Sequence, residues 1–327
     1  MSLDDQSQTQ SSQITTLTTS PRGLHNLGNT CYLNTTLQAL SFCPSFLKFF
    51  IYFDQDSNTP FFNQLKDIYT KLHLQKKEVV PKGLIAALEN SSIGNIIDIK
   101  HPNDMHEFLG LFVDELLEEQ KRIDNLRCLK HIIYGRQQSC IICSHCGYQS
   151  INTEGFTSIM LSFDEQLNQN QDQNKMIDLK DMISYAFQDE NVESRTCDNC
   201  HQKRDEKKKT SIYRLPQVLI LMIKRYDYKG RRINKAINVP YNLDISPLMI
   251  RPWKKNIEHR IKEHKESKSY TIKSIACHYG NLHNGHYYTI CRDSVNQKWY
   301  QINDEEVREL KVLPNSSQYY VLFYEKN

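Results

Sequence analysis

The segment GLHNLGNTCYLNTTLQ, residues 23–38, decides the architecture because it places a cysteine where a helix begins. Three leucines recur at helical spacing after Cys31, and Pro44 ends the run. The pattern therefore predicts a helix of about three turns with Cys31 in its first turn. Unpaired backbone N–H groups and the positive end of the helix dipole stabilise a thiolate at that position, and a thiolate is a nucleophile.

The residues in front of Cys31 are small or polar, which distinguishes it from most free cysteines. A free cysteine is usually a small buried hydrophobe. Here Asn29 or Thr30 is predicted to cap the helix, and Gly28 allows a sharp turn before it. We therefore expect Cys31 to be a reactive thiol. Such a thiol requires a base, usually a histidine, and a third group that orients the imidazole.

A candidate base lies in the segment CHYGNLHNGHYYTICRDSVNQKWYQIND, residues 277–304. His286 follows a glycine and opens HYYTIC, whose aromatic and branched residues are typical of a strand. A second strand-like piece, WYQIN, ends at Asn303 and is followed by Asp304. The polar turn DSVNQK between the two pieces predicts an antiparallel pair. One strand would carry the base and its neighbour would carry the orienting group.

Four of the ten cysteines form two pairs with metal-ligand spacing, Cys143-x2-Cys146 and Cys197-x2-Cys200. The absence of a secretory signal argues against a disulfide framework. Two such pairs can present four thiolates as a tetrahedron, which suits a structural Zn2+ with no open coordination position. The long separation between the pairs predicts two hairpin tips that intervening strands bring together.

Other uses of these cysteines remain open from the sequence. Cys140 could replace a cysteine of the first pair, and His145 or His201 could replace a thiolate, since mixed Cys/His sites are ordinary for zinc. A redox role is disfavoured because neither pair opens a helix in a βαβ pattern. A nucleic-acid role is disfavoured because acids interrupt the basic run of residues 203–209 and the net charge is only +3. We interpret that run as a solvated strand or turn.

Length and composition indicate a globular protein. With 327 residues, of which 39% are hydrophobic, the chain can bury a sizeable core. No apolar run is long enough to cross a bilayer, and the N-terminal residues lack a signal-peptide pattern. We therefore expect a cytoplasmic or nuclear protein with neither a membrane nor a nucleic acid as partner. The polar residues 1–20 predict a disordered tail, and the polar tract at 168–175 predicts a mobile loop.

Periodicity divides the chain into a helical first part and a strand-rich remainder. Apolar residues at helical spacing mark an amphipathic segment at residues 61–72 and a longer one at 105–117. Asp104 is predicted to cap the second segment, with Glu107 three residues later. From about residue 130 the pattern changes to strands separated by polar turns. Helices first and strands afterwards is the order of an α+β fold.

The segments around both candidate catalytic regions resemble the ubiquitin-specific proteases, the papain-like cysteine deubiquitinases. The cysteine box of that family reads approximately GLxNxGNTCYxNSxLQ, and this chain differs from it essentially only by Thr35 in place of the serine. The histidine box corresponds to YTIKSIACHYGNLHNGHYYTI, WYQIND and Val307. An LPxxLxxxLKRF strand of the family corresponds to LPQVLILMIKRY, and the closing strand to YYVLFYEKN. The resemblance extends from Gly23 to the end of the sequence.

This resemblance implies a papain-like cysteine peptidase fold with a helical thumb, β-rich zinc-binding fingers and a β-sheet palm. A single catalytic domain would cover residues 21–327. We expect the thumb at about residues 21–130, the fingers with part of the palm at about 131–225, and the rest of the palm at about 226–327. One structural Zn2+ would belong to the fingers. We also expect a monomer.

The resemblance also implies a role for each candidate catalytic residue. Cys31 attacks the carbonyl after the C-terminal glycine of ubiquitin, and His286 accepts the thiol proton and then protonates the leaving amine. Asn303 occupies the third position of the triad and Asp304 is the adjacent acid, and either could orient His286. Asn26 matches the asparagine whose side-chain amide helps to hold the oxyanion. The implied activity is thiol-dependent hydrolysis of isopeptide or peptide bonds, with ubiquitin and ubiquitinated proteins as partners.

The chain departs from the family pattern in its second box, which reads QQDAHEF in the family. Pro102 and Asn103 replace the two glutamines, and the shorter reach of Asn103 predicts altered substrate contacts on the thumb. Residues 251–268 form a charged insertion that we interpret as a surface excursion. Two other functions remain open from the sequence: a catalytically silent ubiquitin-binding scaffold, and a protease for a ubiquitin-like modifier.

Overall fold

The computed structural model describes residues 21–53, 59–75, 77–122, 129–163, 176–250, 267–281 and 284–327. The predicted tail, the polar tract at 168–175 and most of the insertion at 251–268 lie outside the described residues. The chain divides into two compact units. The first consists of Met1–Leu129, Lys273–Pro314 and Gln318–Phe323, and the second of Lys130–Ile272, Asn315–Ser317 and Tyr324–Asn327.

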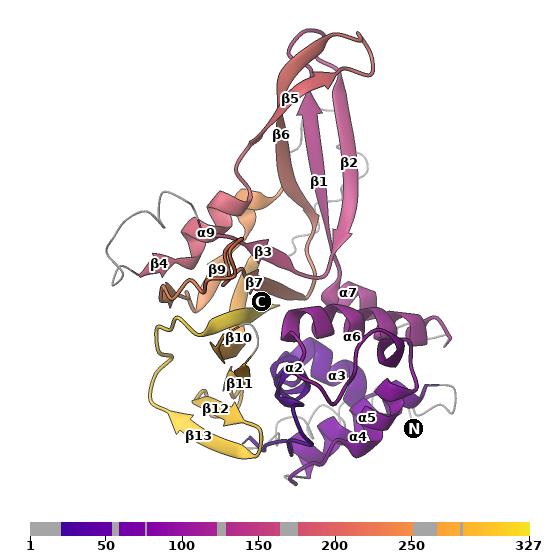
Figure 1. Cartoon of the computed structure of the whole chain (residues 1–327), viewed down its shortest axis with the longest axis vertical. Coiled ribbons are helices and arrows are strands. Elements are labelled where there is room, and N and C mark those ends of the chain that lie inside the picture. The colour runs from indigo at the N-terminus through magenta and orange to yellow at the C-terminus, as the bar shows by residue number, and fades with distance from the viewer. Residues whose placement is uncertain are drawn as a thin grey trace, which may run out of the picture. The chain divides into compact units, whose positions relative to one another are not determined.

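The first unit contains a helical bundle (Figure 1). Its helices are α2 (Cys31–Ser41), α3 (Pro44–Ile51), α4 (Pro60–Tyr69), the π-helix η1 (Thr70–Leu74), α5 (Lys82–Glu89), the 3-10 helix η2 (Ile93–Asn95) and α6 (Met105–Gln120). Both predicted amphipathic segments are therefore helical. Aromatic side chains join the helices, as where the rings of Phe50 and Phe62 meet edge to face with centroids 5.2 Å apart.

Helix α2 is buried along its whole length. It packs against α3 and α6 on the helical side and against strands β11 and β12 on the other. Because a helix buried all round has no freedom to shift, this packing fixes the position of its first residue, Cys31. The predicted capping of α6 is confirmed, since the Asp104 side chain accepts hydrogen bonds from the backbone N–H groups of His106 and Glu107.

The first unit also holds antiparallel strands. They are β11 (Gly285–Arg292), β12 (Trp299–Asn303), β13 (Glu306–Leu310), β10 (Ser269–Gly280) from Lys273 onward and β14 (Tyr319–Lys326) as far as Phe323. The antiparallel pairing of β11 with β12 confirms the sequence prediction, and Tyr279 on β10 lies opposite His286 on β11. Asp304 and Glu305 form the turn between β12 and β13.

The second unit is built mainly of strands. A four-stranded antiparallel sheet in the order β2-β1-β6-β5 consists of β1 (Gly135–Ile142), β2 (Gln149–Phe156), β5 (Glu190–Thr196) and β6 (Lys203–Arg214). Figure 1 shows it as a long ribbon whose two hairpin tips lie at the same end. The other elements are α7 (Leu129–Ile133), β3 (Ile159–Leu161), β4 (Ile177–Asp178), α9 (Leu179–Ala186), β7 (Val218–Ile223), β8 (Ile237–Asn238), β9 (Asn242–Asp244) and the 3-10 helix η3 (Ser246–Leu248).

The order of the elements, with helices first and sheets afterwards, confirms the α+β class.

Within the part of the chain that the structure describes, no helix has both the length and the apolar character needed to span a lipid bilayer.

Candidate active site and metal site

Cys31 is the first residue of α2, as the sequence predicts. Its side chain is nearly buried, with 9% of the residue exposed. The chain turns into the helix through two residues in the left-handed region, Gly28 with φ of 95° and Asn29 with φ of 55°. Thr30 is the N-cap by position, but its hydroxyl does not cap the helix. It donates instead to Asn26 Oδ1 at 3.1 Å and accepts from the N–H of Leu27.

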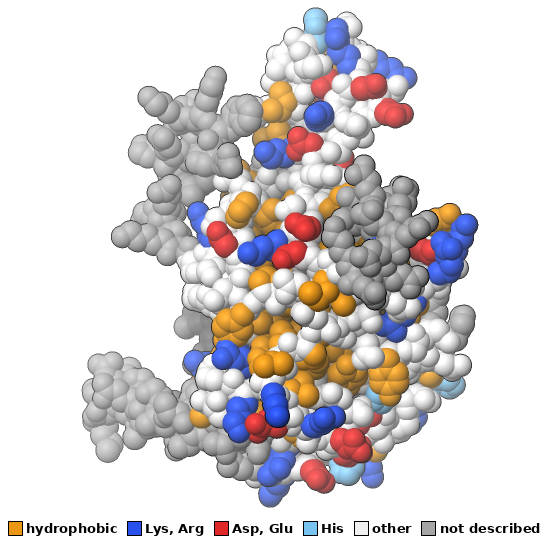
Figure 2. Space-filling model, turned by 90° about the vertical axis from the view of Figure 1, so that its left-hand side faces the viewer, with side chains coloured by type: hydrophobic (Ala, Val, Ile, Leu, Met, Phe, Trp, Pro, Cys, Tyr) orange, Lys and Arg blue, Asp and Glu red, His pale blue; other side chains and the backbone are white. Residues whose placement is uncertain are grey.

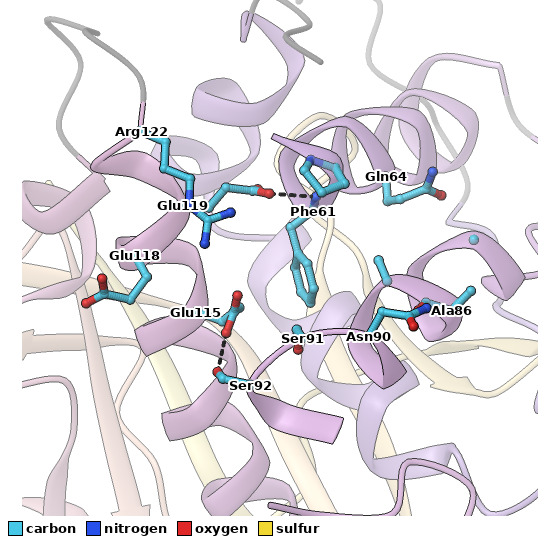
Figure 3. Close-up of a pocket in the computed structure, with 13 residues that line it drawn as sticks. Phe61, Gln64, Ala86, Asn90, Ser91, Ser92, Glu115, Glu118, Glu119 and Arg122 are labelled. Atoms are coloured by element: carbon cyan, nitrogen blue, oxygen red, sulfur yellow. Dashed lines mark hydrogen bonds between the residues drawn. The ribbon is translucent and has the colours of Figure 1, made fainter. Parts of the chain in front are cut away.

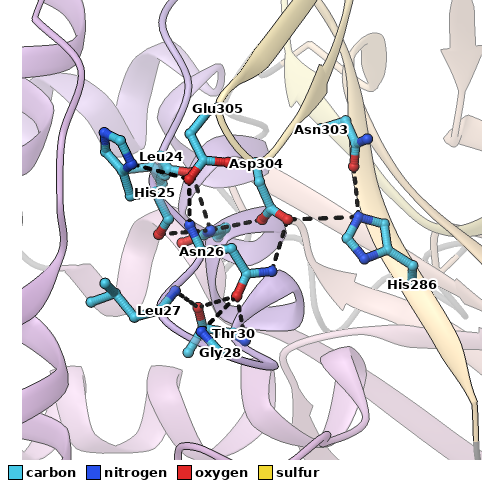
Figure 4. Close-up of polar contacts among 11 residues, drawn as sticks. Leu24, His25, Asn26, Leu27, Gly28, Thr30, His286, Asn303, Asp304 and Glu305 are labelled. Carbon is cyan, nitrogen blue, oxygen red and sulfur yellow. Dashed lines mark hydrogen bonds and ion pairs between the residues drawn. The ribbon is translucent and has the colours of Figure 1, made fainter.

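His286 is half-buried, directly precedes the buried stretch of β11, and lies beside two of the predicted site residues, Asn303 and Asp304 (Figure 4). Its Nε2 is 2.6 Å from Asn303 Oδ1, which can only accept, so Nε2 carries the proton. The hydrogen bond with the Cys31 side chain, opposed by burial and supported by Asn303, raises the pKa of His286 to about 9. The structure therefore brings together the predicted nucleophile and base, and leaves Nδ1 for proton exchange with Cys31.

Asn303 and Asp304 occupy different positions relative to the imidazole. Asp304 Oδ2 is 3.7 Å from His286 Nε2, well beyond the 2.6 Å contact of Asn303. The Asp304 carboxylate accepts instead from two side-chain amides, Asn26 Nδ2 and Asn34 Nδ2, each at 2.8 Å. Geometry thus favours Asn303 as the orienting group. Through these two hydrogen bonds Asp304 connects the turn after β12 to the segment that carries Cys31.

Asn26 is held at both ends of its amide. Its Oδ1 accepts from the backbone N–H groups of Gly28 at 3.0 Å and Thr30 at 3.2 Å, while its Nδ2 donates to Asp304. One of the two Nδ2 hydrogens is therefore used within the protein, and the second is the one that could reach an oxyanion. The role of Asn26 in the oxyanion hole stays a prediction.

Gly23 explains why the N-terminal segment can approach the β12–β13 turn. A Cβ at this position would lie 2.4 Å from the carbonyl oxygen of Asp304 and 2.5 Å from that of Glu305. The closeness lets the N–H of Leu24 donate to the Asp304 carbonyl at 2.9 Å, and lets Glu305 accept from the N–H of Asn26 at 3.0 Å. The glycine that opens the cysteine box is thus required by close backbone contact.

Asp104 joins α6 to the strand that carries His286. Its Oδ1 caps the helix, and its Oδ2 accepts from the hydroxyl groups of Tyr287 at 3.2 Å and Tyr320 at 2.7 Å. Asn103, which replaces a glutamine of the family box, donates to the backbone carbonyls of Asp98 and His101, both at 2.8 Å. Its amide therefore holds the loop before α6.

Four contributors to this centre were not predicted from the sequence: Asn34, Tyr287, Glu305 and Tyr320. Asn34 lies one helical turn after Cys31, and that spacing from the nucleophile was a signal that could have found it. Tyr287 follows His286 directly, so its place beside the centre could also have been expected. Nothing in the sequence indicates that Glu305 accepts from Asn26 or that Tyr320 bonds to Asp104, because these contacts cross between distant segments.

The four cysteines of the two CxxC pairs form one cluster in the second unit. Their Sγ atoms all lie within 4.8 Å of one another. Cys143 Sγ is 3.8 Å from Cys200 Sγ, and Cys146 Sγ is 3.7 Å from Cys197 Sγ. Among the described residues this group contains neither Cys140 nor a histidine, so the alternative ligand sets are not supported.

Each pair sits in a turn of the same construction. We call residues 143–148 the first knuckle and residues 197–202 the second knuckle. In the first, Cys143 N–H donates to the Tyr148 carbonyl at 2.8 Å and Gly147 N–H donates to the Cys143 carbonyl at 2.9 Å. In the second, Cys197 and His201 make the same two bonds, both at 3.0 Å, to the carbonyls of Gln202 and Cys197.

The surroundings of the cluster favour the thiolate at Cys146 and disfavour it at Cys200. Hydrogen bonds from the Asn199 side chain and the backbone of Tyr148 lower the pKa of Cys146 to about 6. The backbone of Gln202 lowers the pKa of Cys200, but desolvation and hydrogen bonds with the other three cysteine side chains outweigh this effect and raise it to about 12. Four thiolates this close repel one another, so full ionisation needs a cation among them.

The basic run of residues 203–209 forms the first part of strand β6, and most of its side chains are exposed. The prediction of a solvated strand is wrong at Glu206, which is only 7% exposed. On the face in Figure 2, basic and acidic side chains are interspersed over the upper end, where the four-stranded sheet lies. Such mixing does not create a field of one sign.

A pocket of about 660 Å³ lies among α4, α5 and α6 (Figure 3). Its lining includes Glu119, whose buried carboxylate accepts from the N–H groups of Phe61 at 3.0 Å and Phe62 at 2.7 Å. Because Glu119 satisfies the free N–H groups at the start of α4, its role is structural. None of the predicted catalytic residues lines this pocket, so it does not mark the reaction site.

Comparison with known proteins gives a consistent result. A family model described as Ubiquitin carboxyl-terminal hydrolase matches residues 22–324. The chain is 28% identical to Ubiquitin carboxyl-terminal hydrolase 15 of Schizosaccharomyces pombe, over 87% of this chain and 24% of that protein. It is 26% identical to Ubiquitin carboxyl-terminal hydrolase 25 of Arabidopsis thaliana, over 94% of this chain and 47% of that protein. The chain thus spans half or less of the length of these two relatives.

Solved structures share the fold. The chain is similar to a chain in the structure of the SAGA Ubp8/Sgf11/Sus1/Sgf73 DUB module bound to ubiquitin aldehyde, with a TM-score of 0.74 and 21% identity. The similarity covers 95% of this chain and 71% of that chain. It confirms the fold class that the resemblance implied.

Proposed function

Because the chain belongs to the ubiquitin carboxyl-terminal hydrolase family, we propose that it hydrolyses the isopeptide or peptide bond after the C-terminal glycine of ubiquitin. The observation that carries this proposal is the arrangement of three side chains: Cys31 begins α2, His286 contacts the Cys31 side chain, and His286 Nε2 lies 2.6 Å from Asn303 Oδ1. A thiol and an imidazole in this contact form the nucleophile and base of a cysteine peptidase.

The proposed reaction has two stages. His286 Nδ1 takes the proton of Cys31, and the thiolate attacks the carbonyl carbon. As the C–N bond breaks, the same proton passes to the leaving amine and a thioester remains. Water, deprotonated by His286, then hydrolyses the thioester and restores the thiol. Through both stages Asn303 accepts from Nε2, which keeps the ring in the orientation that directs Nδ1 to the sulfur.

The oxyanion formed in each stage needs donors. We assign this role to the backbone N–H of Cys31 and to the second hydrogen of Asn26 Nδ2. Asp304, which accepts the first hydrogen, would set the direction of the amide. A donor of this kind contributes about 2.7–4 kcal/mol to transition-state stabilisation. An Asn26→Ala variant that still folds and binds ubiquitin but turns over about 100-fold or more slowly would support the assignment.

For the four-cysteine cluster we propose a structural Zn2+. A tetrahedron with Zn–S bonds of about 2.3 Å has S–S edges of roughly 3.8 Å, and two of the Sγ–Sγ distances are 3.8 and 3.7 Å. The donor set of four thiolates leaves no position for substrate, so the ion would stabilise the fold and take no part in hydrolysis. Metal analysis of the purified protein tests the proposal, and a near-stoichiometric zinc content is expected.

The proposed partners are ubiquitin and ubiquitinated proteins, with the chain acting as a monomer and without nucleic acid or a membrane. We further propose a cytoplasmic or nuclear location. Each described cysteine is a free thiol, which fits a reducing compartment. Size-exclusion chromatography with light scattering tests the monomer, and imaging of the tagged protein in its own cells tests the location.

The experiment for the proposed activity is reaction with ubiquitin that carries a C-terminal electrophile. Rapid formation of a covalent adduct on Cys31, located by mass spectrometry, is expected. Faster labelling by a ubiquitin-like modifier would favour a protease for that modifier. Binding of ubiquitin without any adduct would favour a catalytically silent scaffold and would overturn the proposal.

Cys140→Ala is the matched control for Cys31→Ala. Cys140 is a partly exposed free thiol on β1, outside both candidate sites. Its removal should leave the labelling rate unchanged, whereas Cys31→Ala should give no adduct.

A further inference from the structure

We propose that Glu206 is a positioning residue of the metal site, because its buried carboxylate holds the backbone of the first knuckle in the shape that presents Cys143 and Cys146. The inference rests on the proposed Zn2+. It concerns how this chain positions two of the proposed metal ligands, Cys143 and Cys146.

The side-chain hydrogen bonds that the structure describes for Glu206 go to one residue of the first knuckle, Ser144. Both of its carboxylate oxygens accept from the backbone N–H of Ser144, each at 3.1 Å. Its Oε1 also accepts from the Ser144 hydroxyl at 3.1 Å. Ser144 lies directly after the ligand Cys143, so a bond to its amide fixes the direction in which the knuckle leaves that ligand.

Burial separates Glu206 from the charged residues around it. Glu206 is 7% exposed, whereas its neighbours Asp205 and Lys207 are exposed to solvent. A carboxylate taken out of water has a large desolvation cost that only strong hydrogen bonds offset. Its bonds to Ser144 are of this charge-assisted type. A buried glutamate in the exposed first part of β6, residues 203–207, therefore has a local role, which is to hold the first knuckle.

The second knuckle is held in a different way. Asp198 occupies the position there that corresponds to Ser144, and its exposed carboxylate pairs with Arg195 at 2.9 Å and accepts from the Ser150 hydroxyl at 3.5 Å. Among the described residues, no buried carboxylate accepts from the Asp198 backbone N–H as Glu206 does from that of Ser144.

Coulomb's law indicates that the metal site benefits from the hydrogen bonds of Glu206 and not from its negative charge. Four thiolates and one Zn2+ carry a net charge of −2, so another anion nearby is unfavourable. Glutamine at position 206 would keep an oxygen that accepts from the Ser144 N–H and would remove the charge. A positioning role therefore predicts that glutamine replaces glutamate with little loss, while alanine does not.

Zinc release to the chromogenic chelator 4-(2-pyridylazo)resorcinol tests the proposal on the full chain. Partners behind metal ligands typically change affinity by about 10–100-fold, so Glu206→Ala should release zinc about 10–100-fold faster than the wild type. Glu206→Gln should stay within roughly threefold of the wild type, since it preserves the main hydrogen bond. Glu193→Ala, which removes an exposed glutamate from β5 of the same sheet, is the matched control and should match the wild type.

Ser144→Ala provides a second variant in case Glu206→Ala fails to fold. It removes only the hydroxyl bond and leaves the N–H bond, so zinc release should accelerate by roughly two- to tenfold. Equal release from the wild type, Glu206→Ala and Ser144→Ala would overturn the inference and leave the zinc proposal intact. Equally fast release from Glu206→Gln and Glu206→Ala would also overturn it, because an acceptor alone would then not suffice. A wild type without zinc would refute the metal proposal first and the inference with it.

Discussion

The active site and the four-cysteine cluster both depend on cysteine sulfur, but each gives the sulfur a different kind of partner. Cys31 meets one imidazole, whose pKa is raised to about 9 by the contact, and the sulfur remains available to attack a carbonyl. In the cluster each sulfur meets three others, and a shared cation would occupy the remaining coordination of all four. The reactivity of a thiol in this chain is thus decided by its neighbours.

The largest effect should come from Cys31→Ala, which removes the nucleophile. The rate of hydrolysis of a fluorogenic ubiquitin substrate is expected to fall by at least about 10⁴-fold, because a water molecule at this position is a far weaker nucleophile than the thiolate. Binding of ubiquitin, measured by calorimetry, should persist. A variant with a tenth of the wild-type rate would show that Cys31 is not the attacking group.

Removal of the metal should destabilise the four-cysteine cluster and leave the reactivity of Cys31 unchanged. A strong chelator is expected to lower the unfolding temperature of the second unit, because structural zinc contributes directly to folding. The alkylation rate of Cys31 by iodoacetamide, followed by peptide mass spectrometry, should not change, since the partners of Cys31 lie in the first unit. Loss of Cys31 reactivity on chelation would mean that the two sites are coupled.

Asn303→Ala should change the pH dependence of hydrolysis. The contact with Cys31 is the largest cause of the raised pKa of His286, and Asn303 adds to it. Imidazolium, which protonates the leaving amine, is lost as the pH rises through that pKa. Without Asn303 the pKa falls, so the alkaline limb of kcat/KM should move to lower pH, and the rate should drop about 10–100-fold.

Asp304→Asn is the matched comparison for Asn303→Ala. It removes the charge of Asp304, which is the last of the causes that raise the pKa of His286, so it should move the alkaline limb less than Asn303→Ala does. If the limb moved further with Asp304→Asn than with Asn303→Ala, Asp304 would be the orienting group.

Gly23→Ala should destabilise the first unit by about 1–3 kcal/mol, because the new Cβ would overlap the carbonyl oxygens of Asp304 and Glu305. Urea unfolding measures the change. Gly110→Ala on α6 is the control, since a Cβ there meets no atom within 4 Å. That variant should gain about 0.5–1 kcal/mol from helix propensity. Equal effects of the two substitutions would argue against the close contact at Gly23.

The smallest effect concerns the two knuckles. His201 has φ of 57°, in the left-handed region, where the first knuckle has Gly147 with φ of 72°. His201→Gly should stabilise the protein by about 0.5–1 kcal/mol, the difference between relieved strain and the added backbone entropy of glycine. Gly147→Ala should have the opposite sign. Thermal unfolding of the zinc-bound protein distinguishes the two, and a destabilised His201→Gly would show that the imidazole itself is needed.

Local signals predicted most of the fold and the site. The leucine spacing and Pro44 placed Cys31 at the start of α2, and the alternation in HYYTIC and WYQIN predicted the antiparallel pair that carries His286 and Asn303. These signals work because side-chain periodicity reports which face of an element is buried. The CxxC spacing likewise predicted a cluster that the structure assembles.

The remaining features depend on contacts between distant segments. Nothing in the run KRDEKKK marks Glu206 as buried, because its burial depends on where the first knuckle lies. The sequence also did not predict which of Asn303 and Asp304 contacts His286 more closely. Neighbouring residues at a strand end point in different directions, and the positive φ of Asp304, 50°, turns its carboxylate toward Asn26 and Asn34.

The pKa of His286, measured by NMR on protein with labelled histidine, tests the central claim most directly. His286→Gln identifies the resonance. A pKa of about 9 is expected in the wild type and a lower pKa in Cys31→Ala, because the Cys31 side chain is the largest cause of the raised pKa. A value near the ordinary 6.5 in the wild type, or the same value in both proteins, would contradict the pairing of Cys31 with His286.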